Sequence, residues 1–317
     1  MNILCVWKKV MEQDQNQKPK RLRPFIYWTG GKSRNMSYIA RNYPRRPFTT
    51  YVEPFLGSGV VMMDIITKYQ VKNIIANDIN KELINTFEQV RDNCDDVIER
   101  YLELEKEYIE AASQEDGQKN MYYNKRKAYN EVLNGKIDEL DDIDIAALFI
   151  FLNRTCKDGS YRVNRQGFFT TAWNERTVTE PMLNMDELRE ISKVLKPVKF
   201  TSGSYDNCLS SIDEDTFVYL DPPYIFDIDP SLKFKNVSVP YCTEPFTSQS
   251  FDEFKDFVEK VHDKGASILI TIPARDRDNE KDKVKEMFKD YRIKEFGVGR
   301  PDENGAQTRF EYTISNY

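Results

Sequence analysis

The sequence predicts an α/β fold, in which one sheet domain is assembled from both ends of the chain and is interrupted by a mostly helical insertion. The pattern of residues 51–76 indicates a strand, a glycine-containing loop, a helix and a second strand, which is how a parallel sheet begins. Strands and helices alternate again from about residue 198. Residues 81–194 show helical periodicity and, apart from one hairpin, no alternation typical of strands.

The composition is that of a globular protein with a large core. The chain has 317 residues, of which 40% are hydrophobic and 13% aromatic. A chain of this length can bury one sizeable α/β core or two modest ones. The mean hydropathy of −0.65 and the lack of a long apolar run argue against a membrane-spanning segment.

The first unit of the predicted sheet places an acidic residue after a strand. Its strand, loop, helix and second strand are expected at residues 51–53, 54–59, 60–69 and 71–76. The second strand runs into Asn-Asp-Ile-Asn at 77–80. Asp78 therefore follows the second strand of a β-loop-α-β unit.

The insertion has three parts. A helical, acidic and aromatic stretch at 81–135 is followed, after an acidic connector, by an apolar helix at 145–152. Residues 159–172 then predict a β-hairpin with Gly167 at its turn. We assign residues 1–23 to a flexible basic tail, 24–80 and 195–317 to the sheet domain, and 81–194 to the insertion.

The remaining strands of the sheet lie in the second half of the chain. They are expected at residues 199–202, 216–220, 267–272, 292–298 and 310–315.

The net charge of −6 conceals a strong segregation. Residues 1–50 contain 11 Lys and Arg against 2 Asp and Glu, a balance of +9. A second basic stretch, residues 154–165, carries four Lys and Arg against one Asp. Local charge decides what a surface attracts, so these runs are either solvated faces or anion-binding surfaces.

Cysteine and histidine usage excludes several classes of site. The five cysteines are widely spaced, without a C-x-x-C pair, which fits neither a zinc site nor a compact disulfide framework. The only histidine, His262, falls in the last turn of an amphipathic helix, where it serves the helix dipole or faces solvent. We therefore expect no metal site and no histidine-based catalysis, and chemistry that relies on carboxylates, backbone groups and aromatic rings.

The glycine loop and Asp78 together predict a nucleoside-binding site. Asp78 follows Gly59 by nineteen residues, at a place where a carboxylate can accept hydrogen bonds from both hydroxyls of a ribose. The full G-x-G-x-x-G and P-loop patterns are missing, so the cofactor is expected to lack a pyrophosphate. S-adenosylmethionine (AdoMet) meets this description. The alternative for Asp78 is a turn or helix cap.

Asp-Pro-Pro-Tyr at 221–224 carries the predicted reaction. An apolar strand at 216–220 delivers Asp221 to its carboxyl end, and the two prolines fix the backbone. The Asp221 carboxylate and the Pro222 carbonyl can each accept one N–H of a planar amine, while Tyr224 stacks on the base. Direct methyl transfer to that amine follows without a covalent intermediate. The alternative is a simple turn.

The sequence resembles the Dam-type family of adenine-specific DNA methyltransferases. Four motifs occur in the family's order: Tyr-Trp-Thr-Gly-Gly-Lys at 27–32, Glu-Pro-Phe-Leu-Gly-Ser-Gly at 53–59, Asn-Asp-Ile-Asn at 77–80 and Asp-Pro-Pro-Tyr at 221–224. The match runs from about residue 24 to 317. It implies a Rossmann-like AdoMet-dependent methyltransferase domain, with residues 81–194 as a mostly helical target-recognition domain that carries the hairpin.

The resemblance also implies which residues bind the cofactor. Trp28, Lys32, Asp78 and Asp221 are expected to contact AdoMet, together with Glu53, Phe55 and Gly57 of the glycine loop and its strand. Outside the family, a core tryptophan and a solvated lysine are the simpler interpretations of Trp28 and Lys32. For Glu53, capping of the following helix is an equal alternative to binding the methionine ammonium.

Double-stranded DNA is the expected partner, because residues near the hairpin match the family's DNA-reading segment. Flipping an adenine out of the duplex requires compensating contacts to phosphates and bases. The expected DNA-binding residues are Asn153, Arg154, Lys157, Tyr161, Arg162, Asn164 and Arg165.

Several positions depart from family members that methylate GATC. Tyr27 replaces a lysine, Lys157 a tyrosine and Ser160 a bulky apolar residue, while Ala-Trp-Asn at 172–174 replaces Pro-Phe-Gly. We therefore expect an adenine methyltransferase with a recognition sequence other than GATC. Thr-Ile-Pro at 271–273 replaces the usual Ser-Asn near the base pocket, which raises the question of activity.

Two alternatives remain open: a catalytically silent DNA-binding relative, and a methyltransferase for cytosine N4 or RNA adenine. The opening residues 1–7 are too short for a signal-peptide core. We therefore expect an unsecreted protein, located in the cytoplasm or wherever the host or viral DNA resides, with a cognate restriction endonuclease as a possible partner.

Overall fold

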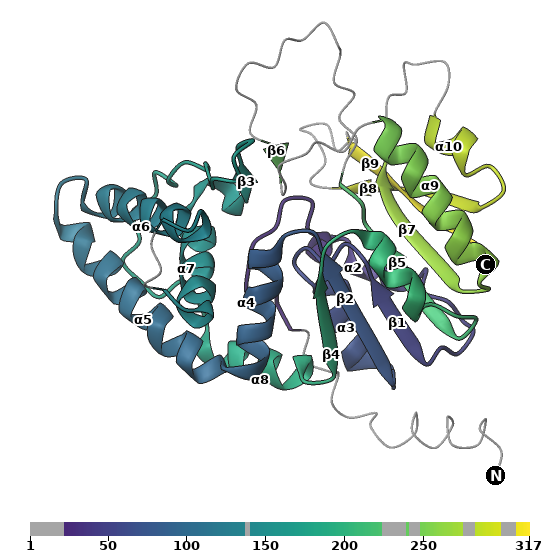
Figure 1. Cartoon of the computed structure of the whole chain (residues 1–317), viewed down its shortest axis with the longest axis horizontal. Helices are drawn as coiled ribbons and strands as arrows, with labels where there is room; N and C mark the ends of the chain where they lie inside the picture. The colour runs from purple at the N-terminus through teal and green to yellow at the C-terminus, as the bar shows by residue number, and fades with distance from the viewer. Residues whose placement is uncertain (1–21, 137–139, 224–238, 241–247, 275–282, 299–308) are drawn as a thin grey trace, which may run out of the picture.

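The computed structural model describes residues 22–136, 140–223, 239–240, 248–274, 283–298 and 309–317 (Figure 1). Nearly all of the predicted basic tail lies outside these residues. So does Tyr224, the aromatic residue of the Asp-Pro-Pro-Tyr motif.

A seven-stranded sheet forms the larger part of the molecule, in the order β4-β2-β1-β5-β7-β9-β8. Every strand is parallel to its neighbours except β9, which runs antiparallel to both β7 and β8. The chain moves outward from β1 through β2 and β4, and then crosses to β5 on the other side of β1. The strand order therefore reverses between β1 and β5, where open α/β sheets bind ligands outside the carboxyl ends of the strands.

The strands confirm the predicted α/β class. In chain order their bounds are β1 Thr50–Glu53, β2 Asn73–Asp78, β4 Val198–Ser202, β5 Thr216–Leu220, β7 Ser267–Pro273, β8 Arg292–Val298 and β9 Arg309–Ser315. Only β2 differs from expectation by more than one residue at its end. Because it extends to Asp78, that carboxylate lies at the end of a strand and not in the following loop.

The central strands are buried on both faces, as expected for a parallel sheet covered by helices. Alternate residues point to opposite faces, so Tyr51 and Phe217 join one apolar cluster while Val52 and Val218 join another. The second cluster is covered by α9 (Ser248–Asp263), which lies over β7 in Figure 1.

The remaining sheet-associated elements are short or flank these strands. They are η1 Lys32–Arg34, α2 Met36–Ala40, α3 Val60–Lys68, η4 Tyr205–Ser211 and α10 Lys283–Met287.

The segment between β2 and β4 is mostly helical, as predicted. Its elements are α4 Lys81–Asp92, α5 Cys94–Glu110, η2 Ala111–Ser113, α6 Gly117–Leu133, α7 Asp142–Thr155, η3 Lys157–Gly159 and α8 Met185–Leu195. Helix α7 is buried along most of its length and contacts α4, α5 and α6, as an all-round apolar helix should. It starts three residues earlier than expected because Asp141 and Asp144 form a capping box.

The helical segment shares its core with the sheet. One apolar cluster contains Phe149 of α7, Phe87 of α4 and Phe217 of β5. Helix α4 also packs on β4, which places it between the sheet and the outer helices (Figure 1). The domain boundary at residue 81 stays a prediction, since the chain crosses it without leaving the common core.

The predicted hairpin is present around Gly167, whose φ of 82° suits its turn. Val163 forms an antiparallel bridge with Phe169. The strand β3 (Arg162–Val163) is only two residues long, and it also pairs with β6 (Val239–Pro240). This second pairing was not predicted, and it connects the hairpin to the part of the chain that follows Asp221.

Within the described part of the chain, no helix combines the length and the apolar character that crossing a membrane requires.

Candidate active site

Asp221 is the central carboxylate of the site. It directly follows β5, next to the point where the strand order reverses, and its side chain is 20% exposed. Lys32 Nζ lies 2.8 Å from Asp221 Oδ1 and 3.7 Å from Glu311 Oε1. Lys32 is itself only 2% exposed. A charge-assisted bond from a buried lysine fixes the position of the carboxylate that it contacts.

The neighbouring strand supports the same carboxylate. Because Leu220 pairs with Ile270 in the parallel register, the next residues, Asp221 and Thr271, lie opposite each other. Thr271 Oγ1 donates to Asp221 Oδ1 at 3.1 Å, and Tyr219 OH lies 2.8 Å from Thr271 Oγ1. Since the threonine proton goes to Asp221, Tyr219 acts as donor to Thr271. The position that departs from the family pattern thus contributes a hydrogen bond to the carboxylate.

The protonation of Asp221 depends on these partners. Burial raises the pKa of Asp221 above its ordinary value, whereas the Lys32 ammonium and the Thr271 hydroxyl lower it. Removing Lys32 would therefore raise the pKa of Asp221 further and favour its neutral form.

The two prolines follow Asp221 at the carboxyl edge of the sheet. Pro222 is buried and Pro223 is partly buried. With φ fixed by the rings, this backbone has little freedom to turn its carbonyl groups. The place of Tyr224 lies outside the described residues, so its predicted stacking on a base stays a prediction.

Asp78 forms the second acidic point of the site, at the end of β2. Its Oδ2 accepts the Gly57 N–H and its Oδ1 the Asn80 N–H, both at 3.0 Å. Burial raises the pKa of Asp78 to about 6, although backbone N–H groups, that of Gly57 foremost, lower it. Each carboxylate oxygen has a further lone pair, so Asp78 serves the turn and can still accept two hydroxyl groups.

Trp28 and Gly57 are in contact. Gly57 has a φ of 49°, and a Cβ at this position would lie 2.9 Å from Trp28 Cδ1, so a glycine lets the indole ring approach the loop. The ring of Trp28 also stacks on Tyr161, with centroids 6.0 Å apart. Phe55 lies in the same loop, with its ring 5.2 Å from that of Tyr205.

Glu53 is buried at the end of β1. Its Oε2 accepts the Tyr51 hydroxyl at 2.6 Å. Burial raises the pKa of Glu53 well above its ordinary value, and the nearby Asp221 raises it further. Hydrogen bonds from the Tyr51 hydroxyl and the Met62 backbone N–H lower it. The Met62 contact supports the helix-capping alternative for Glu53, because Met62 lies in the first turn of α3.

Three of the predicted DNA-binding residues are exposed: Lys157, Arg162 and Arg165. Lys157 begins η3, Arg162 begins β3, and Arg165 lies in the hairpin turn. Arg162 Nε donates to Ser160 Oγ at 3.3 Å, a contact that leaves most of its guanidinium donors available.

Asn153 and Arg154 point inward instead. Asn153 is 3% exposed; it accepts the Tyr27 N–H and donates to the carbonyls of Tyr27 and Gly159. The Arg154 guanidinium binds the Phe25 carbonyl through two nitrogens and lies over the Tyr27 ring. Both side chains fasten α7 to the segment before Trp28, an arrangement that favours a structural role over direct contact with DNA.

Tyr161 and Asn164 are also used internally. Tyr161 is buried and stacks on Phe149 and Phe169 in addition to Trp28. Asn164 Oδ1 accepts the N–H groups of Gln166 and Phe168, which closes the hairpin turn. The alternation that predicted Arg162 and Asn164 on one face did not account for this turn.

Some contributors were not identified from the sequence. Glu311 of β9 shares no motif with Asp221, and only the strand order brings it near that carboxylate, while Tyr219 lies two residues before Asp221 and supports it through Thr271. Among the described residues, no group of three or more His, Cys, Asp and Glu is placed to hold a metal ion. His262 lies in the last turn of α9 and is exposed, as predicted.

Comparisons with known proteins point to one family of enzymes. The family model described as D12 class N6 adenine-specific DNA methyltransferase matches residues 28–299. The chain is 32% identical over 262 residues to the type II methyltransferase M.MjaIII of Methanocaldococcus jannaschii, covering 79% of this chain and 84% of that one.

Two further relatives extend the comparison. The type II methyltransferase M1.LlaDCHI of Lactococcus lactis subsp. cremoris is 25% identical over 301 residues, covering 93% of this chain and 96% of that one. The DNA adenine methylase of Escherichia coli K12 is 27% identical over 256 residues, covering 80% and 81%.

Proposed function

The chain belongs to the D12 class of N6 adenine-specific DNA methyltransferases, and we propose that it transfers the methyl group of AdoMet to the N6 amine of an adenine flipped out of duplex DNA. The observation that carries this proposal is the placement of Asp221. It lies at the end of β5, beside the point where the strand order reverses, and Lys32 and Thr271 both contact its Oδ1 atom.

The geometry leaves part of the carboxylate for the substrate. In the described part of the chain, the contacts from Lys32 and Thr271 both go to Oδ1, while the side chain stays 20% exposed. Oδ2 can therefore accept one N–H of the adenine amine, and the Pro222 carbonyl the other. With both hydrogens held, the nitrogen lone pair is drawn out of the ring and can attack a methyl group placed in line with it.

The residues around the β1/β5 boundary fit AdoMet, which supplies an activated methyl group when bound. Asp78 has lone pairs for two ribose hydroxyls, and an ammonium group beside buried Glu53 would lower the raised pKa of that side chain and favour the carboxylate that binds it. Gly57 allows the approach of Trp28, and that ring, with Phe55, offers apolar surface to an adenine. Lys32 is best assigned to Asp221, which it contacts directly, and acts on the reaction through that residue.

Exposed basic residues are proposed to bind the duplex. Lys157, Arg162 and Arg165 are exposed in the hairpin region. The hairpin strand β3 pairs with β6, which follows the Asp-Pro-Pro-Tyr motif in the chain. Base flipping costs a few kcal/mol, which contacts of this kind can offset. We omit Asn153, Arg154, Tyr161 and Asn164 from direct DNA contact because of their internal bonds, and we retain Tyr224 as the stacking residue.

We further propose a recognition sequence other than GATC. Three positions that depart from GATC-methylating members lie together at the base of the hairpin. Asn153 binds both the N–H and the carbonyl of Tyr27, and Ser160 Oγ lies 3.3 Å from Thr29 Oγ1. Lys157, the third position, is exposed nearby. Two relatives are named type II methyltransferases, which supports the expectation of a cognate restriction endonuclease.

The test is transfer of label from methyl-labelled AdoMet to mixed-sequence duplex DNA, followed by nucleoside analysis. The expected product is N6-methyladenine in DNA. Label on cytosine, label on RNA alone, or DNA binding without AdoMet binding would each contradict the proposal. Mapping the modified adenines after expression in a methylation-free host tests the sequence claim, which modification at GATC would overturn.

A further inference from the structure

A basic hollow lies at the end of the sheet opposite the catalytic carboxylate. It has a volume of about 620 Å³ and is formed where β7 and β8 begin and β9 ends. Ser267 of β7 lines it, whereas Thr271 of the same strand contacts Asp221. Four residues along a strand span about 13 Å, so the hollow is separate from the site that we assign to AdoMet and adenine.

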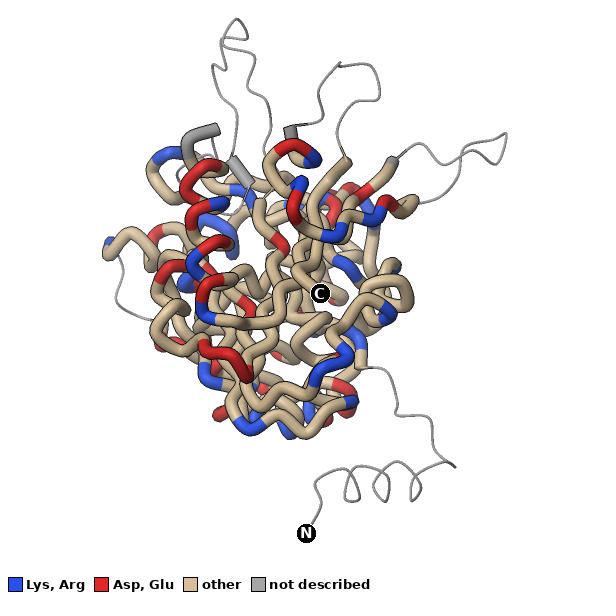
Figure 2. The backbone as a smooth tube through the Cα atoms, turned by 90° about the vertical axis from the view of Figure 1, so that its right-hand side faces the viewer, with Lys and Arg blue, Asp and Glu red and all other residues tan. Residues whose placement is uncertain are grey.

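The charge of its lining is strongly one-sided. Five Lys and Arg side chains line it, and none of the described lining residues is Asp or Glu: Arg41, Arg45, Arg46, Arg292 and Lys294. In the backbone view of Figure 2, basic and acidic positions both occur on the side of the molecule that carries the C-terminus, so the excess of Lys and Arg belongs to the lining of the hollow. Like charges in a shared hollow repel one another, and a bound anion would relieve that repulsion.

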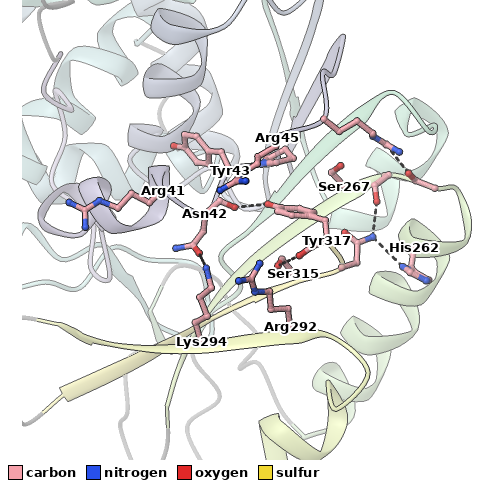
Figure 3. A pocket seen from close by; sticks show the side chains of 15 residues that line it. Arg41, Asn42, Tyr43, Arg45, His262, Ser267, Arg292, Lys294, Ser315 and Tyr317 are labelled. Atoms are coloured by element: carbon pink, nitrogen blue, oxygen red, sulfur yellow. Dashed lines mark hydrogen bonds between the residues drawn. The ribbon is translucent and has the colours of Figure 1, made fainter.

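The walls of the hollow are tied together by hydrogen bonds. Tyr317 OH donates to the Asn42 carbonyl at 2.7 Å, and Lys294 Nζ donates to Asn42 Oδ1 at 2.6 Å (Figure 3). Asn316 donates to the Ala266 carbonyl at 2.8 Å. Segments from both ends of the chain are therefore held in place, and the hollow does not require a ligand to form.

The four arginines of the hollow are exposed, and they differ in the contacts that they make. Arg46 donates to the carbonyls of Glu214 and Gly265, and Lys294 is engaged by Asn42. Arg45 and Arg292 are exposed. Figure 3 shows Arg292 extending from β8 into the space beside Tyr317, while Arg41 points away from the centre.

We propose that this hollow binds a ligand bearing several phosphate charges, of about the size of a nucleotide. Guanidinium groups match phosphate oxygens in a bidentate fashion, and the volume is that of a typical small-molecule site. The source of the phosphates is either a free polyphosphate, such as a nucleoside triphosphate, or the backbone of a DNA segment. The proposal uses no residue of the AdoMet or adenine site and stands apart from the proposed function.

The test is calorimetric titration of the whole chain with inorganic tripolyphosphate. The double variant Arg45→Gln/Arg292→Gln is expected to weaken binding by about tenfold or more, because it removes the two guanidinium groups that we assign to the phosphate oxygens. The control Lys119→Gln/Lys127→Gln removes the same charge from α6, where both side chains are exposed, and should leave binding unchanged. Thermal unfolding of both variants checks that they fold.

Absence of tripolyphosphate binding to the parent chain would overturn the proposal, as would equal weakening by the two double variants. A competition arm separates the sources. If a short duplex displaces tripolyphosphate from the parent, and Arg45→Gln/Arg292→Gln weakens duplex binding to the same extent, the site takes DNA backbone. If the duplex and tripolyphosphate bind independently, it takes a free polyphosphate.

Discussion

Charged side chains at the carboxyl edge of the sheet are buried and tied to one another, whereas those of the hairpin that we propose to bind DNA are exposed. Lys32 is enclosed between Asp221 and Glu311, and Thr271 holds the same carboxylate from the neighbouring strand. Arg162 and Arg165 project from a hairpin with two residues of regular strand. A change at the first place disturbs partners on three strands, while a change at the second alters only what the surface meets.

If the hairpin reads DNA as we propose, this difference would allow one reaction to serve many recognition sequences. A buried network tolerates few substitutions, because an unpartnered charge in the interior is costly. Exposed side chains can be exchanged with little effect on folding. The expected departures from GATC-methylating members at Tyr27, Lys157 and Ser160 accordingly lie near the hairpin, and the one expected near Asp221 is at residues 271–273.

The largest effect is expected from Lys32→Met. Leaving Asp221 and Glu311 without their buried cation should destabilise the fold by about 3–5 kcal/mol and lower the methylation rate by about 100-fold. Since the loss of Lys32 raises the pKa of Asp221, and the reaction needs the ionised carboxylate, activity should fall off at a higher pH than in the parent.

The pH–rate profile of methyl transfer measures this effect. Lys68→Met is the matched control, because Lys68 pairs with Asp64 in an exposed position and should cost less than about 1 kcal/mol. An unchanged acidic limb in Lys32→Met would show that Lys32 does not govern the protonation of Asp221.

Asp78→Asn is expected to act in opposite directions on affinity and stability. The folded chain holds the pKa of Asp78 at about 6, above its ordinary value of 3.8. The protonated Asp78 side chain therefore contributes to the stability of the folded chain below about pH 4, and this contribution is lost as the pH rises through 6. As the pH rises from 4.5 to 7.5, the free energy of unfolding of the variant should increase by about 2 kcal/mol relative to that of the parent. The variant should also bind AdoMet at least about tenfold more weakly.

Chemical denaturation at both pH values, with AdoMet titration at pH 7.5, tests both parts. A stability difference that does not change with pH would contradict the buried titration of Asp78. Unchanged AdoMet affinity would remove Asp78 from the cofactor site.

Asn153→Ala separates structural from DNA-reading residues within the predicted set. Loss of the three hydrogen bonds that the buried Asn153 side chain makes to Tyr27 and Gly159 should destabilise the protein by about 2–4 kcal/mol. Sequence preference on DNA should stay as in the parent. Asn85→Ala, which removes an exposed bond to the Asp142 carbonyl and a part-buried bond from Gln89, should cost about 1 kcal/mol. A shifted DNA preference in Asn153→Ala would return this residue to the reading surface.

Arg162→Ala carries the smallest expected effect on stability and the clearest one on recognition. If Arg162 reads a base edge, binding to a panel of duplexes should change by roughly 1–3 kcal/mol at one position only; if it touches phosphate, all duplexes should weaken evenly. Arg154→Ala is the contrasting variant, because its guanidinium binds the Phe25 carbonyl. Unaltered binding to every duplex after Arg162→Ala would exclude both roles.

The catalytic edge was largely predictable from the sequence. A five-residue apolar strand before Asp221 and the β-loop-α-β unit before Asp78 determine which ends of the strands carry the carboxylates. The contact between Thr271 and Asp221 requires the additional knowledge that β7 lies next to β5. Lys32 was expected to contact the cofactor. Its pairing with Asp221 could not be predicted, because the two residues are far apart in the sequence and only the tertiary fold brings them together.

The recognition region was less predictable for a physical reason. Charge and alternation identify residues that can meet DNA, but they do not say which way a side chain turns. Arg154 reaches the carbonyl of Phe25, 129 positions away, and Tyr161 is buried between aromatic rings. Long-range packing decides such cases, while for an exposed residue such as Arg165 the DNA contact stays a prediction.

The most direct test of the account compares Asp221→Ala with Asp290→Ala in single-turnover methyl transfer to duplex DNA. Asp290 is an exposed carboxylate in the turn between α10 and β8, and its loss should leave the rate as in the parent. Asp221→Ala should lower the rate of N6-methyladenine formation by at least about 100-fold while the chain still folds. A rate within a few fold of the parent for Asp221→Ala would contradict the assignment of this carboxylate as the group that holds the adenine amine.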